Sequence, residues 1–77
     1  MKQILSYIIS SLVEEPEKVE IEESEENGII NFNVRVPKEN IGRVIGKEGK
    51  IIRGIRNVMK IPAIKQNKKI NISLEEK

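Results

Sequence analysis

The chain has 77 residues, of which 38% are hydrophobic and only 3% aromatic, and this predicts one small domain, residues 1–77, with an aliphatic core. It contains no Cys and no His, which excludes disulfide bonds, thiolate metal sites and the commonest general acid–base catalyst near neutral pH. Its five serines have no His or Asp to activate them. We therefore expect no catalytic residue, no metal, no cofactor and no enzymatic activity.

The net charge of +2 conceals a strong separation of charge along the chain. Residues 1–34 hold two lysines against eight glutamates, a net of −6, whereas residues 35–69 hold eleven Lys or Arg against two glutamates, a net of +9. Such asymmetry favours one face that attracts a polyanion. On charge alone, the alternative of two ordinary solvated faces stays open.

The first segment predicts a helix over about residues 2–14, closed by Pro16. Its apolar residues follow the i, i+3, i+4, i+7 spacing of one helix face: Met1, Ile4, Leu5, Ile8, Ile9, Leu12 and Val13. The stripe is periodic, carries no signal-peptide cleavage pattern and is too short to span a membrane. We expect it to pack on the core of a cytoplasmic protein that has no membrane partner.

Two strands are predicted next, over about residues 18–24 and 29–36. In the second, Ile30, Phe32, Val34 and Val36 alternate with polar residues, as in a strand with one buried face. The segment between them ends in Asn-Gly, which is favoured where both central residues of a turn need positive φ. The two strands should therefore pair as an antiparallel hairpin.

The spacing of apolar residues then changes to that of helices, over about residues 38–45 and 49–60. Gly54 lies inside the second of these helices, where glycine is unfavourable, and this indicates a close contact. Pro62 should end or kink that helix. A last strand is expected over about residues 69–74, followed by a frayed tail.

The element order is thus αββααβ, an α+β fold. Two helices join the second and third strands, so a right-handed crossover makes these strands parallel and gives a three-stranded mixed sheet with helices packed on one face. The expected core residues are Leu5, Ile8, Leu12, Phe32, Val34, Ile52, Ile55 and Ile72.

The segment between the two paired helices carries the one distinctive motif, Gly46-Lys47-Glu48-Gly49. With the apolar residues on both sides, residues 41–52 resemble the signature of KH domains, in which a GxxG loop joins two helices. The element order resembles the type II arrangement, and at this length the chain is similar to the small bacterial KhpA-type RNA-binding proteins. The resemblance covers nearly the whole chain and implies a single type II KH domain that binds single-stranded RNA, as a post-transcriptional regulator or RNA chaperone.

In KH domains the GxxG loop clamps the backbone of about four nucleotides while the bases enter an apolar groove. The physical chemistry agrees, because glycines allow backbone to approach phosphate and the next helix starts with free N–H groups. By resemblance, Ile41, Val44 and Ile45 line the groove, and the second strand forms its other wall. The RNA-binding residues so implied are Ile41, Arg43, Val44, Ile45, Gly46, Lys47, Glu48, Gly49, Lys50 and Arg53. Substitution of either glycine should spare the fold unless that glycine needs positive φ.

Several alternatives remain. The glycines would also suit a plain joint between two helices, and Arg53 and Arg56 would suit a solvated helix face. An RNA-recognition motif is disfavoured because the sheet offers only Phe32 for stacking, and a nucleotide P-loop is disfavoured by the glycine spacing.

The chain departs from the family at Ile61-Pro62-Ala63-Ile64, where the helix is interrupted. Val58, Ile61 and Ile64 then either form an exposed apolar patch or complete the core. The resemblance implies self-association, or pairing with a larger KH-containing protein. The rival function is accordingly that of a protein-interaction adaptor for which RNA binding is incidental.

Overall fold

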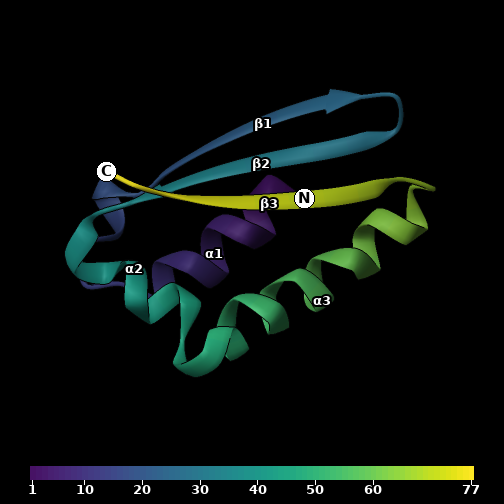
Figure 1. The fold of residues 1–77 in the computed structure, drawn as a ribbon. Coiled ribbons are helices and arrows are strands. Elements are labelled where there is room, and N and C mark those ends of the chain that lie inside the picture. The colour runs from purple at the N-terminus through teal and green to yellow at the C-terminus, as the bar shows by residue number, and fades with distance from the viewer.

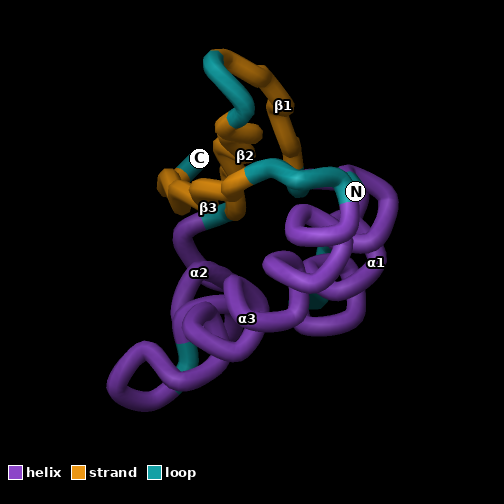
Figure 2. The backbone as a smooth tube through the Cα atoms, turned by 90° about the vertical axis from the view of Figure 1, so that its right-hand side faces the viewer, coloured by secondary structure: helices purple, strands orange, loops and turns teal.

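The computed structural model describes all 77 residues. Three strands form a sheet, and three helices cover one face of it (Figures 1 and 2). In chain order the elements are α1 (Lys2–Leu12), a 3₁₀ turn (Pro16–Lys18), β1 (Glu20–Glu26), β2 (Ile29–Val36), α2 (Lys38–Ile45), a second 3₁₀ turn (Lys47–Gly49), α3 (Lys50–Lys65) and β3 (Lys69–Glu76). The predicted α+β fold with αββααβ order is confirmed.

The sheet has the strand order β1-β2-β3, with β2 antiparallel to β1 and parallel to β3. Asn27 and Gly28 form the hairpin turn at φ values of 53° and 75°, as the Asn-Gly pair predicts. Because α2 and α3 connect β2 to β3, the last strand is carried to the edge of the sheet. This edge position of β3 decides where the candidate site lies.

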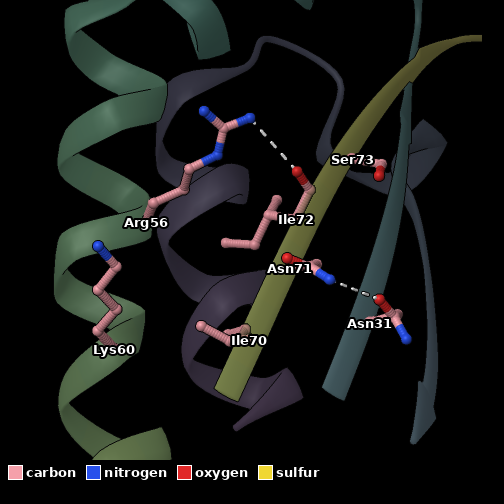
Figure 3. A pocket seen from close by; sticks show the side chains of 7 residues that line it. All are labelled: Asn31, Arg56, Lys60, Ile70, Asn71, Ile72 and Ser73. Atoms are coloured by element: carbon pink, nitrogen blue, oxygen red, sulfur yellow. Dashed lines mark hydrogen bonds between the residues drawn. The ribbon is translucent and has the colours of Figure 1, made fainter. Parts of the chain in front are cut away.

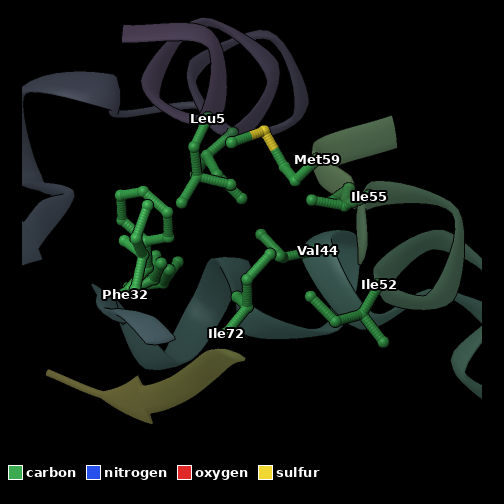
Figure 4. Packing of buried hydrophobic residues seen from close by; sticks show 11 residues of the cluster. Leu5, Phe32, Val44, Ile52, Ile55, Met59 and Ile72 are labelled. Atoms are coloured by element: carbon green, nitrogen blue, oxygen red, sulfur yellow. The ribbon is translucent and has the colours of Figure 1, made fainter. Parts of the chain in front are cut away.

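The core lies between the sheet and the helices (Figure 4). Every second residue of β2 is buried, as predicted, and Phe32 is 1% exposed. Ile8 and Leu12, expected in the core, are half-buried and pack against its edge instead. The buried cluster comprises Leu5, Ile9, Ile30, Phe32, Val34, Val36, Val44, Ile52, Ile55, Met59 and Ile72.

The segment between α1 and β1 differs from the prediction. α1 ends at Leu12, because Val13 is already extended, with φ −109° and ψ 158°. Pro16 therefore does not close this helix but opens the following 3₁₀ turn, a position where its missing N–H costs nothing. The first strand consequently begins at Glu20 rather than near residue 18.

The expected end of this helix at about residue 60 is wrong, since α3 continues past Pro62 to Lys65. A proline removes one hydrogen bond from the helix ladder, but its own carbonyl still accepts from Gln66 N–H at 3.2 Å. Burial of Met59 and Ala63, at 0% and 1% exposure, holds both sides of the proline against the core. Packing of these side chains thus outweighs the tendency of proline to end a helix.

The close contact expected at Gly54 is also absent. This glycine is exposed, and a Cβ built on it would meet no atom within 4 Å. Nothing inside the chain therefore requires a glycine at this position.

The C-terminal residues are not frayed, because they are held by the sheet. β3 extends to Glu76, and Lys77 N–H donates to Val36 O at 2.9 Å. Arg35 of β2 contacts carboxylates of both neighbouring strands, those of Glu75 on β3 and of Glu22 and Glu20 on β1, and these carboxylates raise the pKa of its guanidinium. The Lys77 ammonium, 2.8 Å from Glu20, lowers the pKa of that carboxyl, so this contribution to stability is lost as the pH falls through the lowered value.

The packing of α1 leads to a stability prediction. Replacing Ile9, which is 0% exposed, by Ala should lower the free energy of unfolding by about 2–5 kcal/mol, measured as the urea midpoint. Ile4→Ala, on the same helix but at a side chain that is 44% exposed, should change it by no more than about 0.5 kcal/mol. Equal effects of the two substitutions would contradict the observed orientation of α1.

Candidate nucleic-acid interface

The loop between α2 and α3 turns sharply because three of its four residues have positive φ. Gly46, Glu48 and Gly49 have φ values of 75°, 57° and 74°, a region open to glycine and unfavourable for glutamate. The turn is closed by Gly49 N–H, which donates to Gly46 O at 3.2 Å. Arg53 Nη2 also donates to Glu48 O, at 2.8 Å, and so ties the loop to the first turn of α3.

The two glycines of the motif differ in their surroundings. A Cβ on Gly46 would lie 2.5 Å from Ile51 Cγ1, whereas a Cβ on Gly49 would have no neighbour closer than 4.0 Å. Gly46 is thus needed for the loop to pack on α3, whereas a Cβ on Gly49 would make only ordinary van der Waals contact with Arg53 and Ile52. Both glycines need positive φ, so neither can be replaced without strain.

The basic side chains around the loop form no ion pairs. No side chain caps the N-terminus of α3, and Lys47, Lys50 and Arg53 form no ion pair. The helix dipole adds partial positive charge at the same end. An anion approaching Gly49 therefore meets backbone N–H groups and side-chain cations together.

Other residues expected at the site lie elsewhere. Arg43 Nη2 is 2.6 Å from Glu14 Oε1 and so is paired with the segment after α1. Val44 is fully buried in the core cluster, so its side chain anchors α2 and is not open to a ligand. Ile41 is half-buried and Ile45 is 36% exposed, which leaves these two as the apolar surface of α2 next to the loop.

The hollow that follows the loop lies between α3 and β3 (Figure 3). It has a volume of about 330 Å³ and is lined by Asn31, Arg56, Lys60, Ile70, Asn71, Ile72 and Ser73. β2 contributes only Asn31 to this hollow, because β2 is the central strand and β3 occupies the edge beside α3. The expected groove beside α2, with the second strand as its other wall, stays a prediction.

The open edge of β3 is part of this hollow. Lys69 N–H donates to Gly28 O, just before β2, and Lys77 N–H donates to Val36 O at the end of β2; backbone groups alternate in direction along a strand. The backbones of Ile70 and Ile72 consequently face away from the sheet. Arg56 Nη2 lies 3.4 Å from Ile72 O, a weak hydrogen bond that links α3 to this edge.

Sequence reasoning missed Arg56 as a site residue, together with Lys60 and Asn71. The signal for the first two was present, because Arg53, Arg56 and Lys60 recur at helical spacing. Nothing in the sequence indicated which strand would lie beside them. Asn71, whose Nδ2 donates to Asn31 Oδ1 at 3.2 Å, gave no signal at all.

Comparison with known proteins identifies the family. The family described as "KhpA/KhpB, KH domain" matches residues 2–74. The chain belongs to this family of KH domains. It is 37% identical to the RNA-binding protein KhpA of Chlamydia trachomatis over 76 residues, which cover 99% of this chain and 97% of the relative. It is 40% identical to the RNA-binding protein KhpA of Clostridium perfringens over 74 residues, covering 96% of this chain and 99% of the relative.

The expectation that the chain is not an enzyme is confirmed by its membership of the KhpA/KhpB family of KH domains, in which the relatives are named RNA-binding proteins. No helix has the length and apolar character needed to cross a membrane. No group of three or more His, Cys, Asp or Glu side chains is arranged to hold a metal ion.

Proposed function

We propose that this protein binds single-stranded RNA, with the loop Gly46–Gly49 holding the sugar–phosphate backbone and the bases lying along the groove between α3 and β3. The KhpA relatives are named RNA-binding proteins, and KH domains bind nucleic acid through such a loop. Because it is not an enzyme, the protein acts by occupying or remodelling RNA, as a post-transcriptional regulator or RNA chaperone in the cytoplasm.

The observation that carries this proposal is the uncrowded backbone at Gly49, beside cations that form no ion pair. A Cβ there has no neighbour closer than 4.0 Å, so a phosphate can approach the backbone directly. Lys47 and Lys50 flank this position without carboxylate partners. A plain helix–helix joint requires neither the uncrowded backbone nor the free charges.

The groove accounts for the base side of the interaction. Ile70 and Ile72 supply apolar surface, and the free backbone edge of β3 offers both donors and acceptors. Arg56 reaches this edge from α3, where it can contact a base or a phosphate. There is no aromatic residue among those lining the hollow, so stacking contributes little and the affinity should depend strongly on salt.

The clamp is tested by a pair of substitutions that differ only in charge. Gly49→Asn and Gly49→Asp add side chains of the same shape, and both residues tolerate positive φ better than most. The Asp variant should bind single-stranded RNA at least about tenfold more weakly than the Asn variant, because it sets a carboxylate against a phosphate. Fluorescence anisotropy with a labelled oligonucleotide measures the difference.

Equal urea midpoints for the two Gly49 variants would show that the fold does not account for any difference. If the folded Asp variant binds as tightly as the Asn variant, the clamp proposal fails and the adaptor function moves ahead.

Lys47→Ala should weaken binding to all sequences alike, since a phosphate contact carries no base information. It should also flatten the slope of log affinity against log salt by up to about 0.7.

A second candidate function is that of an adaptor, acting through self-association or pairing with a larger KH-containing protein. It is favoured by an apolar line on the solvent side of α3. Ile51, Val58 and Ile61 are 38%, 47% and 58% exposed and have the i, i+7, i+10 spacing of one helix face. Gly54 lies in the same line, with open space above it, which would let a second helix approach closely. Ile64, three residues after Ile61, is its neighbour on the helix surface and also lines a hollow beside Lys60.

The apolar line on α3 predicts different effects for two exposed apolar residues. Ile61→Glu should convert a dimer to monomer in sedimentation velocity at high micromolar concentration, because a charge would be buried in the apolar line. Tyr7→Glu, at a residue of α1 that is 79% exposed, should leave the dimer intact. A wild-type protein that sediments only as monomer would contradict self-association.

A further inference from the structure

A second hollow continues the groove at the far end of α3. It has a volume of about 290 Å³ and is lined by Lys60, Ala63, Ile64, Lys68, Lys69 and Ile70. Lys60 and Ile70 also line the first hollow, so the two hollows are adjacent. The loop, the first hollow and the second hollow therefore follow one another along α3.

The second hollow depends on how α3 ends. The helix passes Pro62 and so brings Ala63 and Ile64 to the groove. Asn67 then adopts φ 57°, and Lys68 N–H donates to Ala63 O at 2.9 Å, the pattern of a Schellman motif. This turn reverses the chain and places Lys68 and Lys69 opposite Lys60.

The lining combines an apolar floor with a basic rim. Ala63 is buried, while Ile64 is 72% exposed and is not a member of the core cluster. Lys68 pairs with Glu25 at 2.8 Å, but Lys60 and Lys69 have no carboxylate within 4.0 Å. Apolar surface beside free ammonium groups suits a ligand that joins a flat ring to an anion.

We propose that the second hollow binds a further nucleotide of the same RNA strand, beyond those held at the clamp. The base would lie on Ile64 and Ile70, and its phosphate would contact Lys60 and Lys69. From Gly49 to Ala63 the helix rises by about 20 Å, so this nucleotide lies well beyond the loop. The inference rests on the proposed RNA binding, and charge complementarity favours RNA over a protein segment.

The test compares short and long RNA with a matched pair of lysine substitutions. Fluorescence anisotropy is measured with labelled oligouridines of about four nucleotides, the length a KH clamp holds, and of about twice that length. Lys69→Gln removes a charge from the second hollow. Lys65→Gln removes the same charge from an exposed residue of α3 that lines neither hollow.

The wild type should bind the longer RNA more tightly than the shorter one. Lys69→Gln should weaken binding of the longer RNA alone, by about two- to fivefold, the effect expected for one exposed ion pair. Ile64→Ser should likewise reduce the advantage of the longer RNA, through loss of the apolar floor. Neither substitution should alter binding of the shorter RNA, and Lys65→Gln should leave the advantage of length intact.

If Lys65→Gln and Lys69→Gln weaken binding of the longer RNA equally, the effect is one of general charge and the inference is overturned. A longer RNA that binds no more tightly than the shorter one would overturn it as well, while leaving the clamp in place. If the wild type binds neither RNA, the proposed function itself fails, and this inference with it.

Discussion

The parallel pairing of β2 with β3 is the constraint on which the rest of the structure depends. Parallel neighbours cannot be joined by a tight turn, so the chain must cross from one end of the sheet to the other. Here α2, the loop and α3 make that crossing. The connection therefore places a sharp glycine turn at the far side of the helical layer, and returns α3 beneath the strand that becomes the open edge. The loop and the groove are both products of one topological requirement.

The separation of charge in the sequence becomes a separation of surfaces in the fold. The acidic residues concentrate in β1, at one edge of the sheet, where like charges also discourage pairing with another strand. Arg56 and Lys60 of α3 line the opposite edge, beside β3. Arg35, on the central strand, is held by glutamates of its neighbours and does not join the basic surface. A polyanion is thus directed to the groove and repelled from β1.

Much of this fold could be predicted from local patterns. The alternation along β2 and the Asn27-Gly28 turn gave the hairpin, and the change of apolar spacing gave α2 with its bounds at Lys38 and Ile45. The failures share a cause, because each depends on contacts between segments far apart in the sequence. Helix α3 continues past Pro62 because burial of neighbouring residues outweighs one lost hydrogen bond. The last residues of β3 are ordered by Lys77 and its partners on the other strands.

For the candidate site, the sequence predicted the loop and its charge but not the groove. The two glycines lie where the motif required them, and positive φ at both explains why. Which residues face the groove followed from the edge position of β3, which no local pattern reveals. Arg43 had the expected charge and position, yet its pairing with Glu14 directs it away from the loop. Spacing along a helix thus indicated candidates, and the tertiary fold selected among them.

The central claim is that RNA lies along the loop and the open edge of β3. The most direct measurement is an NMR titration of the isotopically labelled protein with a short single-stranded RNA, followed through the backbone amide resonances. The account predicts the largest shifts at residues 46–49 and at Ile70 and Ile72, with β1 (Glu20–Glu26) unaffected. Largest shifts on β1 or on the solvent side of α1, or the absence of any shift at the loop, would contradict it.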